Sequence, residues 1–310
     1  MALNYAEVWS PDLLEIMEQE SLTSPFVTTA VKWLSAKTFH FTQMSTSGYK
    51  SHSRLGGWNK GTFAQTDVPF TLTHDRDISF LLDKIDVDET NETASIKNIS
   101  EVFHKTQQIP EMDAYFYSKV ATEAQKLDGY HSSTALSSYT KENVYGKLKA
   151  MLSAGKLRRY VAKGALIAYV NSTIMDLLEQ STDFTRKIEM TQIAEGGIGI
   201  ETRITDIDGV TLIEVIDDER FYDKFDFTDG FAPVASTSHK INVLIASPLT
   251  VKTVPKIASI YYFNPGQHTE GDGYLYQDRS LSDTFVFPNG KDNKIDSIYV
   301  DVDTETYSAA

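Results

Sequence analysis

Acidic residues spaced like the ligands of a cation site are the first side chains in the sequence that could do chemistry. Asp86, Asp88 and Asn91 follow part of a calcium-loop pattern, but the glycine and the closing glutamate of such a loop are not at their required positions. Segment 206–209 ends in Asp-Gly between two strand-like stretches, and this pair is typical of a hairpin turn that needs no metal. We therefore expect a solvated acidic turn, a β-turn and no metal site.

The motifs of common enzyme active sites are also absent from the sequence. The glycines within 196–199 precede a predicted strand instead of opening a helix, so their amide groups would not point at a phosphate. The sequence has no Walker loop, no G-x-S-x-G elbow and no cysteine. The seven histidines show no HExxH or paired spacing and stand at positions 40, 52, 74, 104, 131, 239 and 268. We therefore expect no catalytic residue, no cofactor and no enzymatic activity.

Arginines beside carboxylates form a second group of candidates. Asp75, Arg76 and Asp77 lie in one strand-like segment, and Arg279 and Asp283 lie in another. These residues could serve as catalytic acids with an arginine clamp. Arginine forks more often fix carboxylates at domain or subunit joins, so we expect structural ion pairs here.

The composition indicates a folded, acidic chain. The 310 residues include 16 Tyr, 16 Phe and 3 Trp, which is enough large apolar surface for one large core or two modest ones. The net charge of -14 opposes binding to free nucleic acid, because that affinity comes largely from Lys and Arg on phosphates. An acidic surface remains compatible with enclosing DNA at a distance.

The sequence carries no sign of export or of membrane insertion. The first 20 residues hold acids where a secretory signal needs a basic start. The longest apolar stretch, 165–170, is far shorter than the ~20 residues that cross a bilayer. The lack of cysteine suits a reducing cytosol. We expect a soluble chain with no membrane partner.

The first 82 residues are predicted to form extensions that cannot bury their own apolar surface. Segment 21–37 is irregular, and its Phe26, Val31, Trp33 and Leu34 have no element of their own to pack on. Segments 38–47 and 67–82 read as the two strands of a long hairpin, with a basic, glycine-rich stretch between them. A two-stranded ribbon is marginally stable alone, so its natural use is to lie on another surface.

The rest of the chain mixes helices and strands. A helix is predicted from about residue 96 to 108, and Pro110 restarts it as far as Gly129, giving one long bent axis. Helices at 140–154 and 172–180 accompany buried strands at 165–170 and 241–246 and a hairpin around 208–209. Strands follow at 274–287 and 295–302, and the tail from 304 looks frayed.

Several stretches resemble a known family. FTLTHDRDISFLLDKIDVDETN followed by IPEMDAYFYSKVA is similar to the hairpin end, acidic turn and spine helix of tailed-bacteriophage major capsid proteins with the Hong Kong 97-like fold. GIETRITDIDGVTLIEVID and INVLIASPLTVKTVPKIASIYYFNP resemble the axial-domain hairpin and the central axial strand with its return path. GYLYQDRSLSDTFVF is similar to the closing peripheral strands. These matches cover about residues 70 to 300 in the order of the family.

The resemblance implies an α+β fold in five segments. They are an N-terminal arm (1–37), an extended β-hairpin loop (38–80), a peripheral domain with a long spine helix (81–130), an α/β axial domain (131–257), and the return strands of the peripheral domain with the C-terminal tail (258–310). Some relatives carry an N-terminal scaffolding segment for which this chain has no room, so a scaffolding protein is expected to be separate.

The resemblance also implies a function. The chain is expected to self-assemble as pentamers and hexamers into an icosahedral head around double-stranded DNA, without sequence-specific binding, first in the host cytoplasm and then in the virion. Implied partners are a scaffolding protein, a portal and optional decoration proteins. Expansion from a precursor shell would then alter the contacts of the arm, the hairpin and the bent helix. An encapsulin-like compartment shell that houses cargo enzymes is the alternative.

Ten residues are predicted to make contacts between subunits. The aromatic side chains of the arm and hairpin need a partner surface, which neighbouring copies would provide. The basic hairpin tip is expected to settle on the acidic run 83–92 of an adjacent copy, unless its cations are merely solvated. One branch of the family forms lysine–asparagine cross-links, for which Lys50 or Lys60 would be the candidates, but we expect none here. The predicted contact residues are Trp33, Lys50, Arg54, Trp58, Lys60, Phe63, Asp83, Asp86, Asp88 and Glu89.

Overall fold

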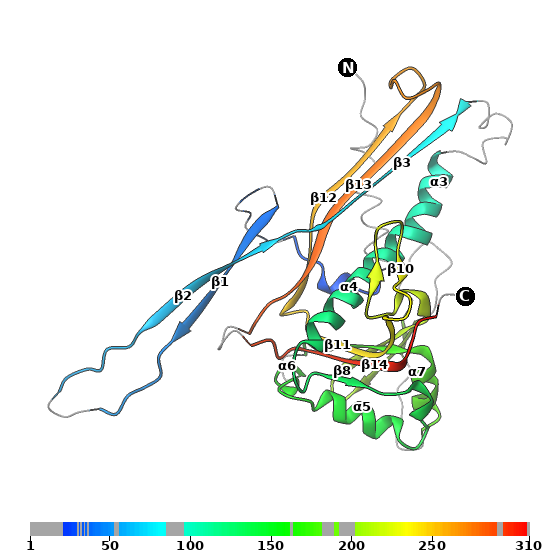
Figure 1. Ribbon diagram of the computed structural model, residues 1–310. Helices are drawn as coiled ribbons and strands as arrows, with labels where there is room; N and C mark the ends of the chain where they lie inside the picture. Colours follow the sequence, from blue (N-terminus) through cyan, green and yellow to red (C-terminus); the bar gives the residue numbers. More distant parts are fainter. Residues whose placement is uncertain are drawn as a thin grey trace.

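The computed structural model describes residues 21–29, 31, 33, 35, 37–52, 56–84, 96–161, 164–181, 189–191, 202–289 and 294–308. Figure 1 shows three parts: a large mixed sheet with helices, a smaller sheet that runs beside a long helix, and a two-stranded ribbon that projects from the region between them. In the part of the chain that is described, no helix combines the length and the apolar character needed to cross a membrane.

The larger sheet has seven strands. Two neighbouring pairs are parallel, β14 with β4 and β5 with β8, and the other neighbours are antiparallel. The strand order is β4 (His131–Ser133), β14 (Ile298–Thr306), β11 (His239–Ala246), β5 (Ile167–Asn171), β8 (Val210–Val215), β7 (Thr202–Ile207) and β6 (Glu189–Thr191). The two predicted buried strands, 165–170 and 241–246, therefore lie next to each other as β5 and β11.

Helices cover both faces of this sheet. Helices α5 (Val144–Leu152), α6 (Arg158–Val161) and α7 (Ser172–Glu179) pack on one face, where Val243 and Ile245 of β11 point. Helix α4 (Ile109–Gln125) packs on the other face, against Leu244. Because successive residues of a strand point to opposite faces, a strand covered on both sides needs the continuous apolar run seen in β11.

The long helix is continuous, as predicted, and contains an irregular turn. Helix α3 (Ile96–Phe103) leads into a π-helical segment (His104–Gln108), which leads into α4. Pro110 stands in the first turn of α4. The wider π turn lies just where proline, lacking an N–H group, cannot continue the regular hydrogen-bond ladder.

The smaller sheet is antiparallel and lies along this helix. Its strand order is β12 (Val251–Phe263), β13 (Gly273–Val286) and β3 (His74–Asp83). Leu82, Ile260 and Tyr276 form its buried face, and Ile99 of α3 packs against them.

The predicted strand 67–82 is in fact two strands in different sheets. Strand β1 (Thr38–Thr46) pairs with β2 (Phe63–Thr71) in the ribbon, whereas β3 belongs to the smaller sheet. The chain changes sheets at residues 72 and 73. Leu72 is buried there, and Asp283 accepts hydrogen bonds from the backbone N and the hydroxyl of Thr73 at 2.9 and 2.8 Å. The alternation of apolar and polar residues along 67–82 gives no sign of this tertiary contact, so the sequence predicted one strand.

The start of the arm packs on its own chain, which corrects the prediction that Phe26 needs a neighbouring copy to bury it. Phe26 is fully buried, with its ring 4.7 Å from that of Phe116 of α4. Asp113 of α4 is also fully buried and accepts hydrogen bonds from the hydroxyls of Ser21 and Thr23 at 2.6 and 2.7 Å. An apolar anchor and a buried carboxylate therefore fix residues 21–26 to α4.

Two further boundaries differ from the predictions. Helix α5 begins at Val144 instead of residue 140, and Gly155 follows its end with a φ of +51°. The C-terminal tail was expected to fray from residue 304, but β14 extends to Thr306, and the N–H of Tyr307 donates to the carbonyl of Ser238. The predicted hairpin turn is confirmed, since Asp208 and Gly209 both have positive φ, at +53° and +78°.

We predict that Phe26→Ala lowers the free energy of unfolding by about 3–5 kcal/mol, because it opens a cavity between the arm and α4. Urea denaturation followed by far-UV circular dichroism measures this change. Thr29→Ala is a control at an exposed position of the same segment and should cost less than about 0.5 kcal/mol. Equal effects of the two substitutions would contradict the intramolecular anchor.

Candidate interaction surfaces

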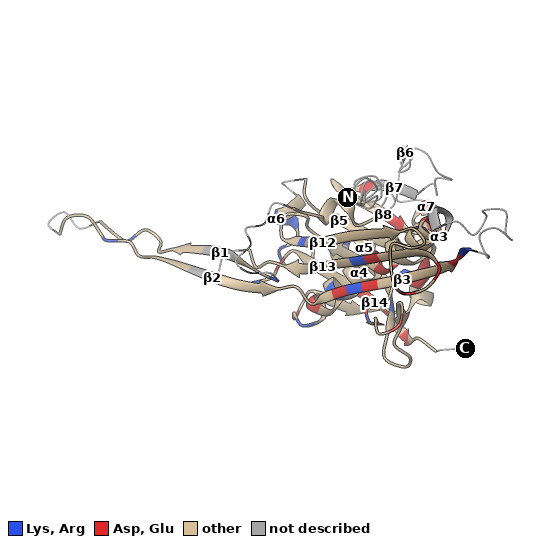
Figure 2. Ribbon diagram, turned by 90° about the horizontal axis from the view of Figure 1, so that it is seen from above, with Lys and Arg blue, Asp and Glu red and all other residues tan. Residues whose placement is uncertain are grey.

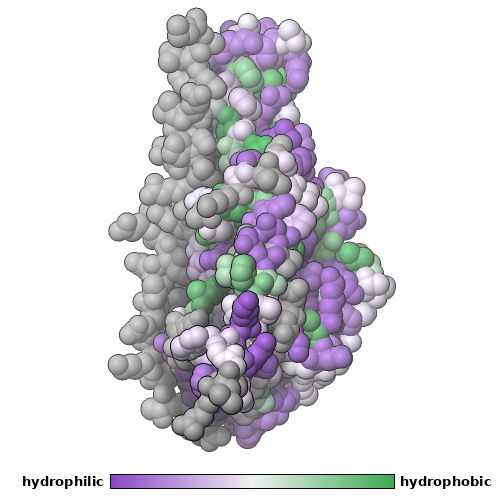
Figure 3. Space-filling model, turned by 90° about the vertical axis from the view of Figure 1, so that its left-hand side faces the viewer, coloured by the Kyte–Doolittle hydropathy of each residue, from purple (hydrophilic) through white to green (hydrophobic). Residues whose placement is uncertain are grey.

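The distal part of the ribbon is the most exposed apolar surface of the described chain. Trp58 is 95% exposed and Phe63 is 76% exposed. Tyr49 and Met44 are also largely exposed. Figures 1 and 2 show the ribbon extending away from the body with no other element over it. Figure 3 views the molecule from the side on which the ribbon projects and shows apolar patches among hydrophilic ones. Large aromatic side chains left in water indicate a surface that binds a partner.

The base of the ribbon, in contrast, is held by the body. Phe39 of β1 is buried, and its ring lies 5.2 Å from that of Phe285. Phe70 of β2 lies 4.9 Å from Phe287. The ring of Trp33 contacts Phe39 edge-on, and the ammonium group of Lys256 lies 3.8 Å above it. Phe39 is thus buried within its own chain, contrary to the prediction that it needs a neighbouring copy, whereas a contact of the half-buried Trp33 with a neighbour stays a prediction.

The tip of the ribbon is basic and locally ordered. The side-chain amide of Asn59 donates to the carbonyl of Ser51 at 2.9 Å, and the ammonium group of Lys50 donates to the carbonyl of Lys60 at 3.4 Å. Neither Lys50 nor Lys60 forms an ion pair within the described part of the chain. Arg54, predicted to join them, lies outside the described residues.

The predicted acidic partner surface is described only at its start. Asp83 is exposed at the end of β3. Asp86, Asp88 and Glu89 lie outside the described residues, as does Asn91. The pairing between the basic tip and this run therefore stays a prediction.

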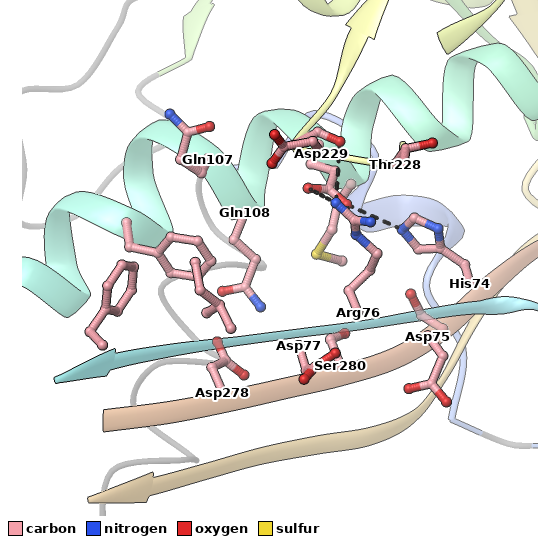
Figure 4. Close-up of a pocket in the computed structure, with 17 residues that line it drawn as sticks. His74, Asp75, Arg76, Asp77, Gln107, Gln108, Thr228, Asp229, Asp278 and Ser280 are labelled. Atoms are coloured by element: carbon pink, nitrogen blue, oxygen red, sulfur yellow. Dashed lines mark hydrogen bonds and ion pairs between the residues drawn. The ribbon is translucent and has the colours of Figure 1, made fainter. Parts of the chain in front are cut away.

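A polar cleft of about 650 Å³ lies between the smaller sheet and the long helix. Figure 4 shows its walls: β3 and β13 on one side, the π segment and the start of α4 on the other, and the loop around Asp229 at one end. This cleft has no counterpart in the local sequence pattern, because its walls come from separate stretches of the chain.

Arg76 ties three of these walls together. Its Nε lies 2.6 Å from Oε1 of Glu111 on α4. Its guanidinium group also donates to the carbonyls of Gly230, at 3.2 Å, and Phe227. Burial raises the pKa of Glu111, and the guanidinium of Arg76 opposes that effect. Arg76 thus has the structural role that was expected: it links a strand, a helix and a loop.

Asp75 and Arg279 form an ion pair on the opposite face of the sheet. Nε and Nη2 of Arg279 lie 3.0 and 2.9 Å from the two carboxylate oxygens of Asp75. Hydrogen bonds from Arg279 and then from Lys37 lower the pKa of Asp75 to about 2. Arg279 is therefore not the partner of Asp283, which instead accepts from Thr73 and from the hydroxyl of Tyr115 at 2.8 Å.

His74 lies at the end of the cleft as a neutral ring. It stacks on Tyr115 with 3.9 Å between ring centroids, and its Nε2 lies 3.6 Å from Oε1 of Glu111. Burial, followed by the positive charge of Arg76, lowers the pKa of His74 to about 4. The imidazole is thus uncharged at neutral pH.

Asp278 is the unusual residue of the cleft. It is only 5% exposed, and its Oδ2 has no hydrogen-bond partner among the described residues. Burial raises its pKa to about 6. In the sequence Asp278 stands beside Arg279 and would be taken for its partner, but strand alternation places the two side chains on opposite faces of the sheet.

Polar and charged side chains make up most of the cleft lining, including Arg76, Glu111 and Asp278. Within the described ranges, no group of three or more His, Asp or Glu side chains could hold a metal ion.

Comparison with known proteins gives matches to solved structures only. No protein-family model and no curated protein matches the sequence. The mature capsid of bacteriophage PhiM1 aligns at 13% identity over 93% of this chain and 88% of that chain, with a TM-score of 0.62. The capsid of cyanophage P-SCSP1u aligns at 11% identity over 90% and 86%, with a TM-score of 0.60. A chain of Mycobacterium phage Ogopogo aligns at 6% identity over 92% of both chains, with a TM-score of 0.56.

These matches run along nearly the whole chain. They show that it has a mixed helix and strand fold of the kind found in bacteriophage capsid proteins, whereas the predicted division into five segments stays a prediction.

We predict that His74→Gln changes how stability depends on pH. The folded-state pKa of His74 is below the unfolded value of 6.5, so the unfolded chain takes up the proton first. The stability that the neutral ring contributes is present above pH 6.5 and is lost as the pH falls towards 4. Between pH 7 and 4 the unfolding free energy of the unmodified chain should fall by up to roughly 3 kcal/mol relative to the variant.

Urea denaturation at a series of pH values measures this difference. His52→Gln removes a histidine from the exposed ribbon tip and serves as the control. Parallel stability profiles for the unmodified chain and His74→Gln would refute the assignment of a buried neutral imidazole.

Proposed function

We propose that this chain is the major capsid protein of a tailed bacteriophage, which assembles into the icosahedral head that encloses double-stranded DNA. The observation that carries the proposal is the exposed aromatic ribbon on a chain that aligns with a phage capsid structure over 93% of its length. A monomer leaves Trp58 and Phe63 in water. A shell of identical copies gives each ribbon a neighbouring body on which to bury them.

The parts of the fold take the following roles in this proposal. The seven-stranded sheet with its helices corresponds to the axial domain, and the smaller sheet with the long helix corresponds to the peripheral domain and its spine helix. Residues 21–37 form the anchored end of the N-terminal arm, and the ribbon is the extended hairpin loop. We place β14 in the axial domain, because it pairs with β11 in the larger sheet and not with the return strands as first expected.

The proposed role is structural and not enzymatic. The acidic chain would enclose DNA without binding a specific sequence. Its net charge of -14 repels the phosphate groups, so the chain is not expected to bind DNA tightly. Pentamers and hexamers, a separate scaffolding protein, a portal and optional decoration proteins belong to the same proposal, as does assembly in the host cytoplasm.

We predict that the purified chain forms closed shells and that Trp58→Ser with Phe63→Thr raises the critical concentration for assembly more than tenfold. Interface aromatic residues contribute about 2 kcal/mol each, and about 1.4 kcal/mol corresponds to a factor of ten. Light scattering over a concentration series and electron microscopy measure the effect, while circular dichroism checks that the variant folds.

Thr46→Ser with Thr62→Ser is the matched control, because it alters the same ribbon and keeps both aromatic side chains. Assembly of the aromatic variant at the concentration of the control would contradict the role of the ribbon. A chain that stays monomeric at every concentration would contradict the shell itself. Particles from infected cells that hold protein cargo instead of DNA would favour a compartment shell.

A further inference from the structure

Asp278 has a buried carboxylate oxygen, Oδ2, that the described part of the chain leaves without a partner. Its residue surface is 95% buried, yet no described residue donates a hydrogen bond to Oδ2. A buried charge without a partner destabilises the fold, so such groups are normally paired or replaced. The other buried aspartates of the chain are partnered: Asp301, for example, accepts hydrogen bonds from Tyr139 and Asn242.

The arginines close to Asp278 already form ion pairs with other carboxylates. Arg76 of β3 is held by Glu111 and by two carbonyls of the loop at 227–230. Arg279 follows Asp278 directly but pairs with Asp75 on the other face of the sheet. His74 is neutral, and Asp229 at the cleft end adds a negative charge. Figure 4 shows Asp278 on the side of the sheet that faces the π segment, below Gln108. The cleft therefore offers a carboxylate to a cation from outside the chain.

The ribbon tip carries a cation of the matching kind. The ammonium group of Lys60 forms no hydrogen bond or ion pair within the described residues, whereas the ammonium of Lys50 is turned back onto the carbonyl of Lys60. Figures 1 and 2 show the end of the ribbon far from β13 and α4 of its own chain, which line the cleft. A lysine has a long, flexible stem and three donors, which suits a cleft lined by carboxylate and amide oxygens.

We propose that the cleft between the smaller sheet and the long helix binds the ammonium group of Lys60 from the ribbon tip of a second copy, with Asp278 as its ion-pair partner. This inference rests on the proposed assembly of identical copies.

The substitution Asp278→Asn tests whether Asp278 binds a second copy or only stabilises its own subunit. Asparagine keeps the shape and removes the charge, so the isolated subunit should be as stable as the unmodified chain or more stable at pH 7. The critical concentration for assembly should nevertheless rise at least tenfold. Lys60→Gln should have the same effect on assembly, and the double variant should be no worse than either single variant. A less stable subunit with normal assembly, or additive effects of the two substitutions, would overturn the proposal.

Chemical cross-linking tests the contact directly, because the natural chain has no cysteine. Subunits with Lys60→Cys are co-assembled with subunits that carry Asp278→Cys and treated with a bis-maleimide linker as long as a lysine side chain. We expect covalent dimers in the shells and none in dilute subunits. Ser79→Cys is the control, because Ser79 is exposed on β3 and alternation places it on the opposite face of the sheet.

Each outcome has one meaning. Shells without cross-links at Asp278→Cys, or with equal cross-links at Ser79→Cys, would refute the cleft contact and leave the capsid assignment intact. Failure of the unmodified chain to form shells would overturn the proposed function and this inference together.

Discussion

The packing of α4 against the seven-stranded sheet is the contact on which the rest of the structure depends. Phe116, Tyr117 and Val120 of this helix are almost completely buried on one face of the sheet. The same helix continues through the π segment into α3, which packs on the smaller sheet. One rigid element thus belongs to both cores, and the N-terminal arm is fixed to it through Asp113 and Phe26. The smaller sheet in turn anchors the ribbon through Phe285 and its neighbours.

Buried carboxylates give this architecture its specificity. Asp113, Asp283 and Asp301 are each nearly inaccessible, and each accepts several hydrogen bonds from distant parts of the sequence. A carboxylate of this kind tolerates only one arrangement of its donors, since any other leaves a charge buried and unpaired. Oδ2 of Asp278 has no such donor among the described residues, which is the basis for the proposed partner from another copy.

The sequence predicted the local elements and missed the contacts that join them. The buried strands, the Asp208-Gly209 turn and the long helix follow from local periodicity and turn chemistry. The break between β2 and β3 does not, because Thr73 turns the chain by bonding to Asp283, which is 210 residues away. The burial of Phe26 escaped prediction for the same reason. The cleft could not be predicted either. Its residue Asp278 stands next to Arg279 in sequence, but Arg279 pairs with Asp75 on the other face of the sheet.

The ribbon is divided into an anchored base and an uncovered tip. A hairpin of two strands has no third strand or helix to cover its faces. Here the aromatic cluster around Phe39 fixes the base, so the direction of the ribbon is set by the body. Beyond that cluster the strands keep their pairing, but Trp58 and Phe63 stay in water. A surface held in place yet left uncovered loses little conformational entropy when it binds. In the proposed shell the exposed Trp58 and Phe63 could therefore be buried at a low cost in entropy.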